Sequence, residues 1–272
     1  MPDVARHTGE TLARWAWVEP AAWTPRMLTA LERGVKGGTW FSLSDKVYAL
    51  DNLRAGFTCV KANRGSAGVD HVTVGQFEAR LDENLDRLYG SLRDGTYRPQ
   101  AIRRAWMKKL GSREKRPLGI PTVRDRTVQS ALRNVLEPIF ERDFGEHSYG
   151  FRPNRGAKDA LRRVDGLLRA GHTWVVDADL KSYFDTIPRD RLLERVRTRV
   201  SDGRILALVE AFLRQGVMDG MESWTPTAGT PQGAVIRPLL SNLYLDPLDH
   251  AMAERGFEMT RYADAGPARR AW

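Results

Sequence analysis

The chain has little cysteine and no long hydrophobic run, and both absences narrow what it can be. Cys59 is the only cysteine in 272 residues, which excludes an internal disulfide and a thiolate metal cluster. The five histidines show no spacing typical of a metal site. No stretch approaches the roughly 20 apolar residues of a membrane-spanning helix, and the N-terminus lacks the apolar core of a signal peptide. A cytoplasmic protein with no membrane partner is therefore expected.

Acidic residues are fewer than basic ones, and the imbalance is local. The formal net charge is +9, and 42% of the residues are hydrophobic, which is enough for a core. Residues 101–170 hold 17 Lys and Arg against 8 Asp and Glu, so this one stretch carries the whole excess. Basic patches of this kind bind phosphate backbones. A basic surface can also serve solubility alone, so composition leaves nucleic acid binding and a solvated surface both open.

Hydrophobic periodicity predicts helices interleaved with few strands, which is an α+β fold. Asp125 is expected to cap a helix, and Pro138 to bend that helix. Residues 97–106 are expected to be extended, followed by a hairpin tip and a short strand over 113–121. Helices are expected over residues 45–61, 73–93, 126–144, 157–170 and 204–215, from 188, and from the turn at 230–233 to about 245; strands are expected over 173–179 and 258–264.

Two apolar strands that each end in an aspartate carry the first chemical signal. These aspartates are Asp179 and Asp264. Because side chains alternate along a strand, Asp179 is expected to face a cleft while its strand is anchored in the core. Antiparallel pairing would bring both carboxylates within reach of one pair of Mg²⁺ ions, which phosphoryl transfer uses about 3.5–4 Å apart. Such aspartates are also common as plain turn and cap residues, so this signal alone leaves both interpretations open.

Longer motifs connect these strands in a fixed order. They are RPLGIPTVRDR at 116–126, SYGFRPNR at 148–155, DLKSYFD at 179–185, TPQGAVIRPLLSNLYL at 230–245 and YAD at 262–264. From about residue 45 to residue 264, their order and spacing resemble the reverse transcriptases encoded by bacterial group II introns. The turn NRGSAGVD at 63–70 is similar to the N-terminal block of that family.

The resemblance implies the right-hand fold of a polymerase. It divides the chain into an N-terminal extension (1–44), fingers with an N-terminal helical block (45–172), a partial palm of antiparallel strands packed on helices (173–264) and an aberrant tail (265–272), with the thumb absent. It implies an RNA-directed DNA polymerase, a nucleotidyltransferase that uses two Mg²⁺ ions, binds its intron RNA and assists splicing as a maturase. The implied partners are intron or template RNA, a DNA primer or target, and dNTPs.

The resemblance also implies roles for single residues. Asp179 and Asp264 would be catalytic metal ligands, assisted by the backbone carbonyl of Leu180. Phe184 would be the steric gate that rejects a 2′ hydroxyl, and a plain core aromatic is the alternative. The other implied contacts are of Lys108, Lys109 and Arg116 with the triphosphate, of Gln232 and Gly233 with the template–dNTP pair, and of Arg124, Arg126, Arg152 and Arg155 with RNA. Without the resemblance, these would be solvated charges and a helix-start turn.

The chain departs from the family pattern at its last motif and at one helix start. Ala265 stands where the family has a second Asp, and this loss is expected to abolish polymerisation. Arg237 stands where the family has Ser, and it is expected to crowd the cleft or disturb the helix cap. Gly266 and Pro267 are expected to interrupt the strand. We therefore expect a truncated, inactive copy that arose by a frameshift after Asp264.

Two other functions are compatible with the sequence. One is a non-catalytic RNA-binding remnant that uses the basic surface of residues 101–170. The other is a reverse transcriptase of a retron or a diversity-generating element. The Pro-Gln-Gly turn and the long N-terminal block favour the intron type. An incomplete palm sheet is also expected to leave apolar surface exposed, which promotes aggregation.

Overall fold

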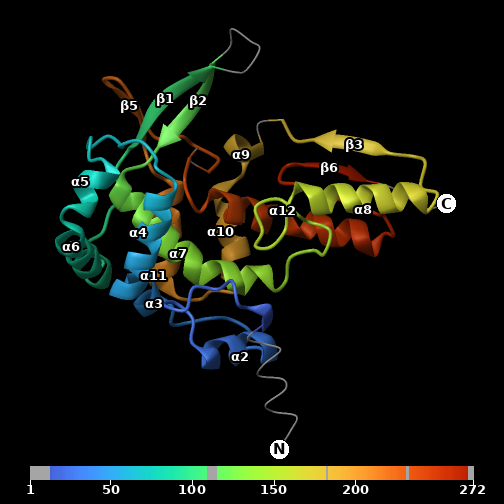
Figure 1. The fold of residues 1–272 in the computed structure, drawn as a ribbon, viewed down its shortest axis with the longest axis horizontal. Coiled ribbons are helices and arrows are strands. Elements are labelled where there is room, and N and C mark those ends of the chain that lie inside the picture. Colours follow the sequence, from blue (N-terminus) through green and yellow to red (C-terminus); the bar gives the residue numbers. More distant parts are fainter. Residues whose placement is uncertain (1–12, 109–114, 182, 231–232, 269–272) are drawn as a thin grey trace, which may run out of the picture.

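The computed structural model describes residues 13–108, 115–181, 183–230 and 233–268. Helices predominate and short strands lie among them, which agrees with the mixed content expected from the sequence (Figure 1). The helices are α2 (Pro25–Arg33), α3 (Ser44–Tyr48), α4 (Leu50–Ala62), α5 (Val74–Glu78), α6 (Leu81–Arg93), α7 (Val123–Glu141), α8 (Ala157–Arg169), α9 (Tyr183–Thr186), α10 (Arg189–Arg197), α11 (Gly203–Leu213) and α12 (Arg237–Glu254). The strands are β1 (Ile102–Lys108), β2 (Lys115–Ile120), β3 (Val176–Asp179), β4 (Val217–Asp219), β5 (Glu222–Trp224) and β6 (Ala265–Ala268).

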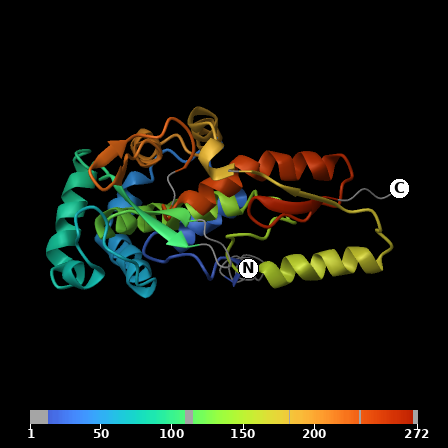
Figure 2. The same cartoon turned by 90° about the horizontal axis from the view of Figure 1, so that it is seen from above.

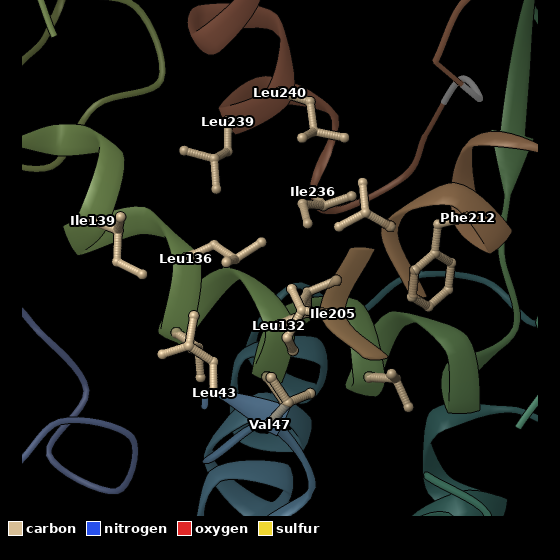
Figure 3. Close-up of a cluster of buried hydrophobic side chains, with 14 of the residues drawn as sticks. Leu43, Val47, Leu132, Leu136, Ile139, Ile205, Phe212, Ile236, Leu239 and Leu240 are labelled. Carbon is tan, nitrogen blue, oxygen red and sulfur yellow. The ribbon is translucent and has the colours of Figure 1, made fainter. Parts of the chain in front are cut away.

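Helix α7 lies at the centre of the hydrophobic core. Leu132 and Leu136 on this helix are fully buried. Figure 3 shows them among side chains that come from α3, α11 and the segment leading into α12, for example Val47, Ile205 and Ile236. Burying one such side chain contributes about 1.5–3 kcal/mol. The core therefore fixes the start of α12, which carries part of the candidate site.

Two of the expected helices are each divided in two, and an asparagine side chain lies at both breaks. Residues 45–61 form α3 and α4, with one extended residue between them. Asn52 Nδ2 donates to the carbonyl of Lys46 at 2.8 Å, so the side chain supplies a hydrogen bond to a carbonyl at the end of α3. Between α5 and α6, Asn84 Nδ2 donates to the carbonyl of Phe77 at 3.0 Å. The expectation of two continuous helices was wrong because periodicity does not register these side-chain bonds.

The cap expected at Asp125 is also corrected. Thr122 is the N-cap of α7, and its side-chain oxygen accepts a hydrogen bond from the Asp125 backbone N–H at 3.1 Å. The Asp125 carboxylate is buried within the helix and accepts from the Tyr97 hydroxyl at 2.6 Å, the Gln100 amide at 2.9 Å and Gln215 Nε2 at 3.2 Å. Burial raises the pKa of Asp125, although these hydrogen bonds oppose the shift. Asp125 therefore joins three segments instead of ending a helix.

The strands form two separate sheets. The larger is mixed, in the order β2-β1-β4-β5, with β1 antiparallel to β2 and parallel to β4. The smaller is an antiparallel pair of β3 and β6. Figures 1 and 2 show the β1–β2 hairpin away from this pair, which lies toward the end of the molecule where the C-terminus is. The two sheets thus lie in different parts of the molecule (Figure 1).

Strand β3 is shorter and more exposed than the sequence suggests. It covers only Val176–Asp179, and all four residues are exposed. Trp174, just before the strand, is 79% exposed. The expectation that this strand is anchored in the core was therefore wrong, because a two-stranded sheet offers it no second layer. The exposed apolar surface expected in this region is present.

The last strand begins where the sequence was expected to interrupt it. Residues 258–264 are irregular apart from isolated bridges, whereas Ala265–Ala268 form β6. Pro267 pairs in register with Asp177. Proline is tolerated at sheet edges, where its missing N–H disturbs no ladder, and in a two-stranded sheet each strand has a free edge. The expectation from Gly266 and Pro267 therefore holds for a central strand and not for this one.

Candidate active site

A buried arginine positions the turn that carries Asp264. Arg261 is buried, and its guanidinium lies in a bidentate ion pair with Asp249, with distances of 2.8 and 2.6 Å. Its remaining donors reach Asn242 Oδ1 at 2.9 Å, the Ala263 carbonyl at 2.7 Å and Ser148 Oγ at 2.7 Å. A buried charge is tolerated when it is paired and its hydrogen bonds are satisfied. Arg261 was not singled out from the sequence, because no motif links it to Asp249 and Asn242 on α12 or to Ser148, which lies 113 residues away.

The backbone of this turn adopts an uncommon conformation. Ala263 has a φ of 58°, in the left-handed region that residues with a side chain rarely enter. It is buried against Gly150, where a Cβ atom would overlap the Ala263 backbone nitrogen. Gly150 is therefore required for the chain to approach this closely. Outliers of this kind cluster at functional sites, so the geometry marks the turn before Asp264 as a candidate site.

Pairing of β3 with β6 brings the two predicted carboxylates to neighbouring positions. The register places Asp179 opposite Ala265, and Asp264 is the residue just before. Residues directly opposite each other in such a pair have Cβ atoms about 4.5–5.5 Å apart. The position that faces Asp179 is thus held by Ala265, where the family pattern has an aspartate. Asp179 and Leu180 are exposed, and Asp264 is half-buried.

The residues present do not fit a complete two-metal site. In the described part of the chain, no group of three or more His, Cys, Asp and Glu side chains could hold a metal ion. Magnesium requires several hard oxygen ligands, and two ions share carboxylates between them. Asp179 and Asp264, with the Leu180 carbonyl, supply only part of such a set. No polymerisation step is therefore assigned to these residues.

Arg237 places a cation beside Asp185 and close enough to Asp264 to interact with its charge. Its guanidinium carbon lies 4.1 Å from the centre of the Phe184 ring, and its Nη2 is 3.7 Å from Asp185 Oδ1. Burial lowers the pKa of Arg237, and the negative charges of Asp185 and Asp264 only partly oppose that shift. Helix α12 begins at Arg237 without a side-chain cap. The arginine therefore occupies the face of the aromatic ring and adds positive charge near Asp264.

Phe184 lies at the edge of the core. Its ring is half-buried and packs against Tyr183 with centroids 5.3 Å apart. The Phe184 carbonyl accepts a hydrogen bond from the Thr230 amide at 2.8 Å. One face of the ring contacts Arg237, as described above, so Phe184 is neither a fully buried core aromatic nor an open platform. Its placement joins α9 to the turn that precedes α12.

That turn approaches the larger sheet closely. Gly233 has a φ of 79°, and a Cβ atom there would overlap the carbonyl oxygen of Gly119 on β2. The Val235 amide donates to Gln129 Oε1 at 2.6 Å, which ties the turn to α7. Both the backbone angle and the contact require glycine at 233. The close neighbour of Gly233 in this structure is thus the backbone of β2; Gln232 lies outside the described residues.

The structure describes only some of the residues that were predicted to contact the triphosphate. Lys109 lies outside the described residues. Lys108 and Arg116 lie on β1 and β2, where Lys108 pairs with Lys115 and Arg116 pairs with Met107. Lys108 is thus the last residue of β1, and Arg116 is the second residue of β2, so both backbone positions lie at the same end of this strand pair.

The four predicted RNA-binding arginines have internal partners. Arg152 is buried, pairs with Glu141 at 2.7 Å, and donates to two backbone carbonyls. Arg126 donates to the Ser66 carbonyl at 2.7 Å and is mostly buried. Arg124 lies 4.7 Å from the Tyr97 ring, and Arg155 donates to the Glu146 carbonyl; both are half-buried. Arg152 and Arg126 therefore organise loops, and Arg124 and Arg155 retain exposed surface.

Comparison with known proteins decides the family. A family model described as reverse transcriptase (RNA-dependent DNA polymerase) matches residues 107–265, which is more than half of the chain. The chain belongs to the reverse transcriptase family. Members of this family copy a nucleic acid template and generally use divalent metal ions. In the part of the chain that the structure describes, no helix is both long and apolar enough to cross a membrane.

Two relatives and one solved structure extend the comparison. Protein YkfC of Escherichia coli (strain K12) is 37% identical over 90% of this chain and 61% of its own length. The group II intron-encoded protein LtrA of Lactococcus lactis subsp. cremoris is 38% identical over 62% of this chain and 28% of its own length. The chain thus spans less than two thirds of either relative. A chain of the partial Cas6-RT-Cas1–Cas2 complex shares the fold, with a TM-score of 0.55 at 20% identity over 84% of this chain and 38% of that one.

Proposed function

We propose that this chain is a reverse transcriptase module of the group II intron type that binds RNA but does not extend a primer. The family match supports the polymerase ancestry, and the similarity to the intron-encoded LtrA favours the intron type over a retron or a diversity-generating lineage. The observation that supports the absence of primer extension is the register of β3 and β6, in which Ala265 lies opposite Asp179. The loss of catalysis therefore follows from the missing carboxylate at position 265.

Under this proposal, residues 45–172 are the fingers and 173–264 belong to the palm. Asp179 and Asp264, with the Leu180 carbonyl, remain from the metal site, and Phe184 is the former sugar gate. When two Mg²⁺ ions are bound to an intact site of this family, they activate the primer hydroxyl and hold the triphosphate. The proposed nucleotide contacts are Lys108, Lys109, Arg116, Gln232 and Gly233, and the proposed RNA contacts are the half-buried Arg124 and Arg155.

Two residues that differ from the family pattern, Ala265 and Arg237, both lower the affinity of this site for divalent cations. Alanine at 265 removes one negative charge from the position opposite Asp179. Arg237 adds one positive charge. This charge interacts with Asp264, because the carboxylate of Asp264 partly opposes the lowering of the pKa of Arg237 by burial. Two unit charges about 4 Å apart interact by about 4 kcal/mol near a protein surface. A dication at the site therefore loses an attraction and gains a repulsion.

RNA binding is the half of the proposal that a direct measurement tests. A labelled RNA is titrated with the 272-residue chain at several salt concentrations. If about six to ten phosphates contact the basic surface, affinity should fall by about 10³ or more between 50 and 200 mM salt. The control variant is Asp179→Ala, which removes a negative charge and no cation, so it should not weaken the binding of a polyanion. No binding, or binding that is independent of salt, would contradict the proposal.

A further inference from the structure

One face of the larger sheet carries two tryptophans with an arginine between them. On β1, Arg104 and Trp106 are two residues apart and therefore share a face. The guanidinium carbon of Arg104 lies 5.5 Å from the Trp106 ring centre and 4.5 Å from the ring centre of Trp224 on β5. We call these three side chains the stacking face. None of them was assigned a role by the sequence motifs or by the candidate active site.

Both tryptophans of the stacking face are accessible. Trp106 is 49% exposed and Trp224 is 36% exposed. The indole N–H of Trp106 donates to Asp219 Oδ2 at 3.3 Å, and the guanidinium lies over the ring, so its position is fixed from two sides. Arg104 covers one face of the Trp106 ring, as Arg237 covers Phe184, but about half of the Trp106 side chain remains exposed, so a flat group can stack on that remaining surface.

The stacking face continues into a cavity of about 280 Å³. Arg104, Trp224, Asp185 and Arg189 are among the residues that line it. Arg189 Nε donates to the Gly229 carbonyl at 3.2 Å, which orients its guanidinium, and burial lowers its pKa. The cavity thus combines an indole wall with two arginines and one carboxylate. It adjoins Asp185, the residue that Arg237 contacts from the other side.

The density of charged residues around this face favours a nucleic acid over a protein partner. By strand alternation and the β1–β2 register, Arg104, Lys108 and Lys115 hold positions on this face, whereas Arg103 and Arg116 hold positions on the opposite face. Strands β4 and β5 add Asp219 and Glu222. Centres of protein–protein interfaces are depleted in charged residues, whereas surfaces for single-stranded nucleic acid combine basic side chains with aromatic platforms. The composition therefore matches an RNA strand whose bases are unpaired.

We propose that the stacking face binds single-stranded RNA, with bases on Trp106 and Trp224 and phosphates at Arg104 and Arg189. This inference rests on the proposed RNA binding and locates a contact that the predicted arginines do not include. Every base has a flat face, so recognition of this kind depends little on sequence. Double-stranded RNA keeps its bases stacked internally, so it gains nothing from the two indoles.

Fluorescence anisotropy with an unstructured single-stranded RNA tests the stacking face in the full chain. Trp106→Ala should weaken binding about 5- to 100-fold, while Trp106→Phe should retain most of the affinity, because a ring remains. Arg104→Lys keeps the charge but loses the planar group, and it should weaken binding less than Trp106→Ala. The matched control is Trp174→Ala, since Trp174 is 79% exposed and lies near β3 instead. Duplex RNA should bind all variants as it binds the wild type.

The outcomes separate this inference from the proposed function. If the wild type binds single-stranded RNA and Trp106→Ala binds it equally well, the stacking face is overturned while RNA binding stands. Equal losses for Trp106→Ala and Trp174→Ala would also overturn it, because the effect would not be local. If the wild type binds no RNA, both proposals fail. Far-UV circular dichroism checks that each variant is folded. If Trp106→Ala does not fold, Arg104→Lys takes its place in the comparison, and unchanged binding by that variant would also overturn the stacking face.

Discussion

At the scale of single residues, the candidate site differs from its family pattern at Ala265 and Arg237. Ala265 lies opposite Asp179 in the β3–β6 register, and Arg237 lies on Phe184 with Asp185 beside it. Each change makes the site less negative. Their effects on a bound dication should therefore reinforce one another.

This leads to a prediction about metal affinity. Ala265→Asp combined with Arg237→Ser should raise the affinity for Mn²⁺ at least about tenfold over the wild type, which corresponds to about 1.4 kcal/mol. Isothermal titration calorimetry measures it, with no need for enzyme activity. Each single substitution should give a smaller gain. Adding Asp179→Ala to the double variant should remove the gain; if the gain persists, the ions bind elsewhere and the assignment of Asp179 is wrong.

At the scale of elements, Asp202 joins two helices through their backbone ends. It is the N-cap of α11 and accepts from the amides of Arg204 at 3.0 Å and Ile205 at 3.3 Å. Across the chain, the amides of Leu43 and Ser44 donate to its other oxygen at 2.8 and 2.9 Å. Burial raises the pKa of Asp202, but the four N–H groups outweigh that effect and hold it below its ordinary value.

Replacing Asp202 should therefore destabilise the fold in a pH-dependent way. Asp202→Ala should lower the free energy of unfolding by about 2–4 kcal/mol at pH 7, because it removes a cap and leaves buried amides unpaired. Because the folded pKa lies below the unfolded value of about 3.9, this contribution is present above that value and is lost as pH falls through the folded pKa. Urea unfolding at pH 7, 5 and 3.5 should show the difference between variant and wild type shrinking only at the lowest pH.

The control for that measurement is Asp82→Ala, which breaks an exposed ion pair with Arg54. Exposed pairs of this kind contribute about 1 kcal/mol or less. A loss as large as that of Asp202→Ala, or a loss for Asp202→Ala that does not change with pH, would contradict the role given to the four backbone amides.

Periodicity and motifs predicted the elements better than their ends. The helices α6, α7, α8 and α11 follow from regular apolar spacing. The motifs also predicted a strand that pairs with the strand of Asp179, but the strand that pairs there is Ala265–Ala268 and not residues 258–264. The helix breaks beside Asn52 and Asn84 were not predicted, because the deciding hydrogen bonds come from side chains. The Arg261 hub was missed for a similar reason: its acceptor Ser148 lies 113 residues away. Long-range polar contacts of this kind leave no local pattern.

At the scale of the whole molecule, the end that carries β3 is unusually apolar for an exposed surface. Trp174, Val175 and Val176 are all exposed there, next to a sheet of only two strands with free edges. Exposed apolar patches and unpaired strand edges both promote association between copies.

Self-association through this region is therefore expected at high protein concentration. Substituting Val175→Thr and Val176→Thr keeps β-branched side chains, so the strand should be retained while the surface becomes more polar. Light scattering coupled to size-exclusion chromatography should show a lower mean mass for the variant than for the wild type. The same pair of substitutions at buried Val128 and Val135 of α7 should instead destabilise the fold. An unchanged mass distribution would show that the β3 end does not mediate association.

The central proposal is that this member of the reverse transcriptase family binds an RNA template without copying it. Primer extension on an RNA template, with Mg²⁺ and all four dNTPs, tests it most directly when run on the preparation whose RNA binding has just been measured. We predict saturating template binding and no extended primer, and no rescue by Ala265→Asp alone, because Arg237 still lies on Phe184. Synthesis of cDNA by the unaltered 272-residue chain would contradict the account.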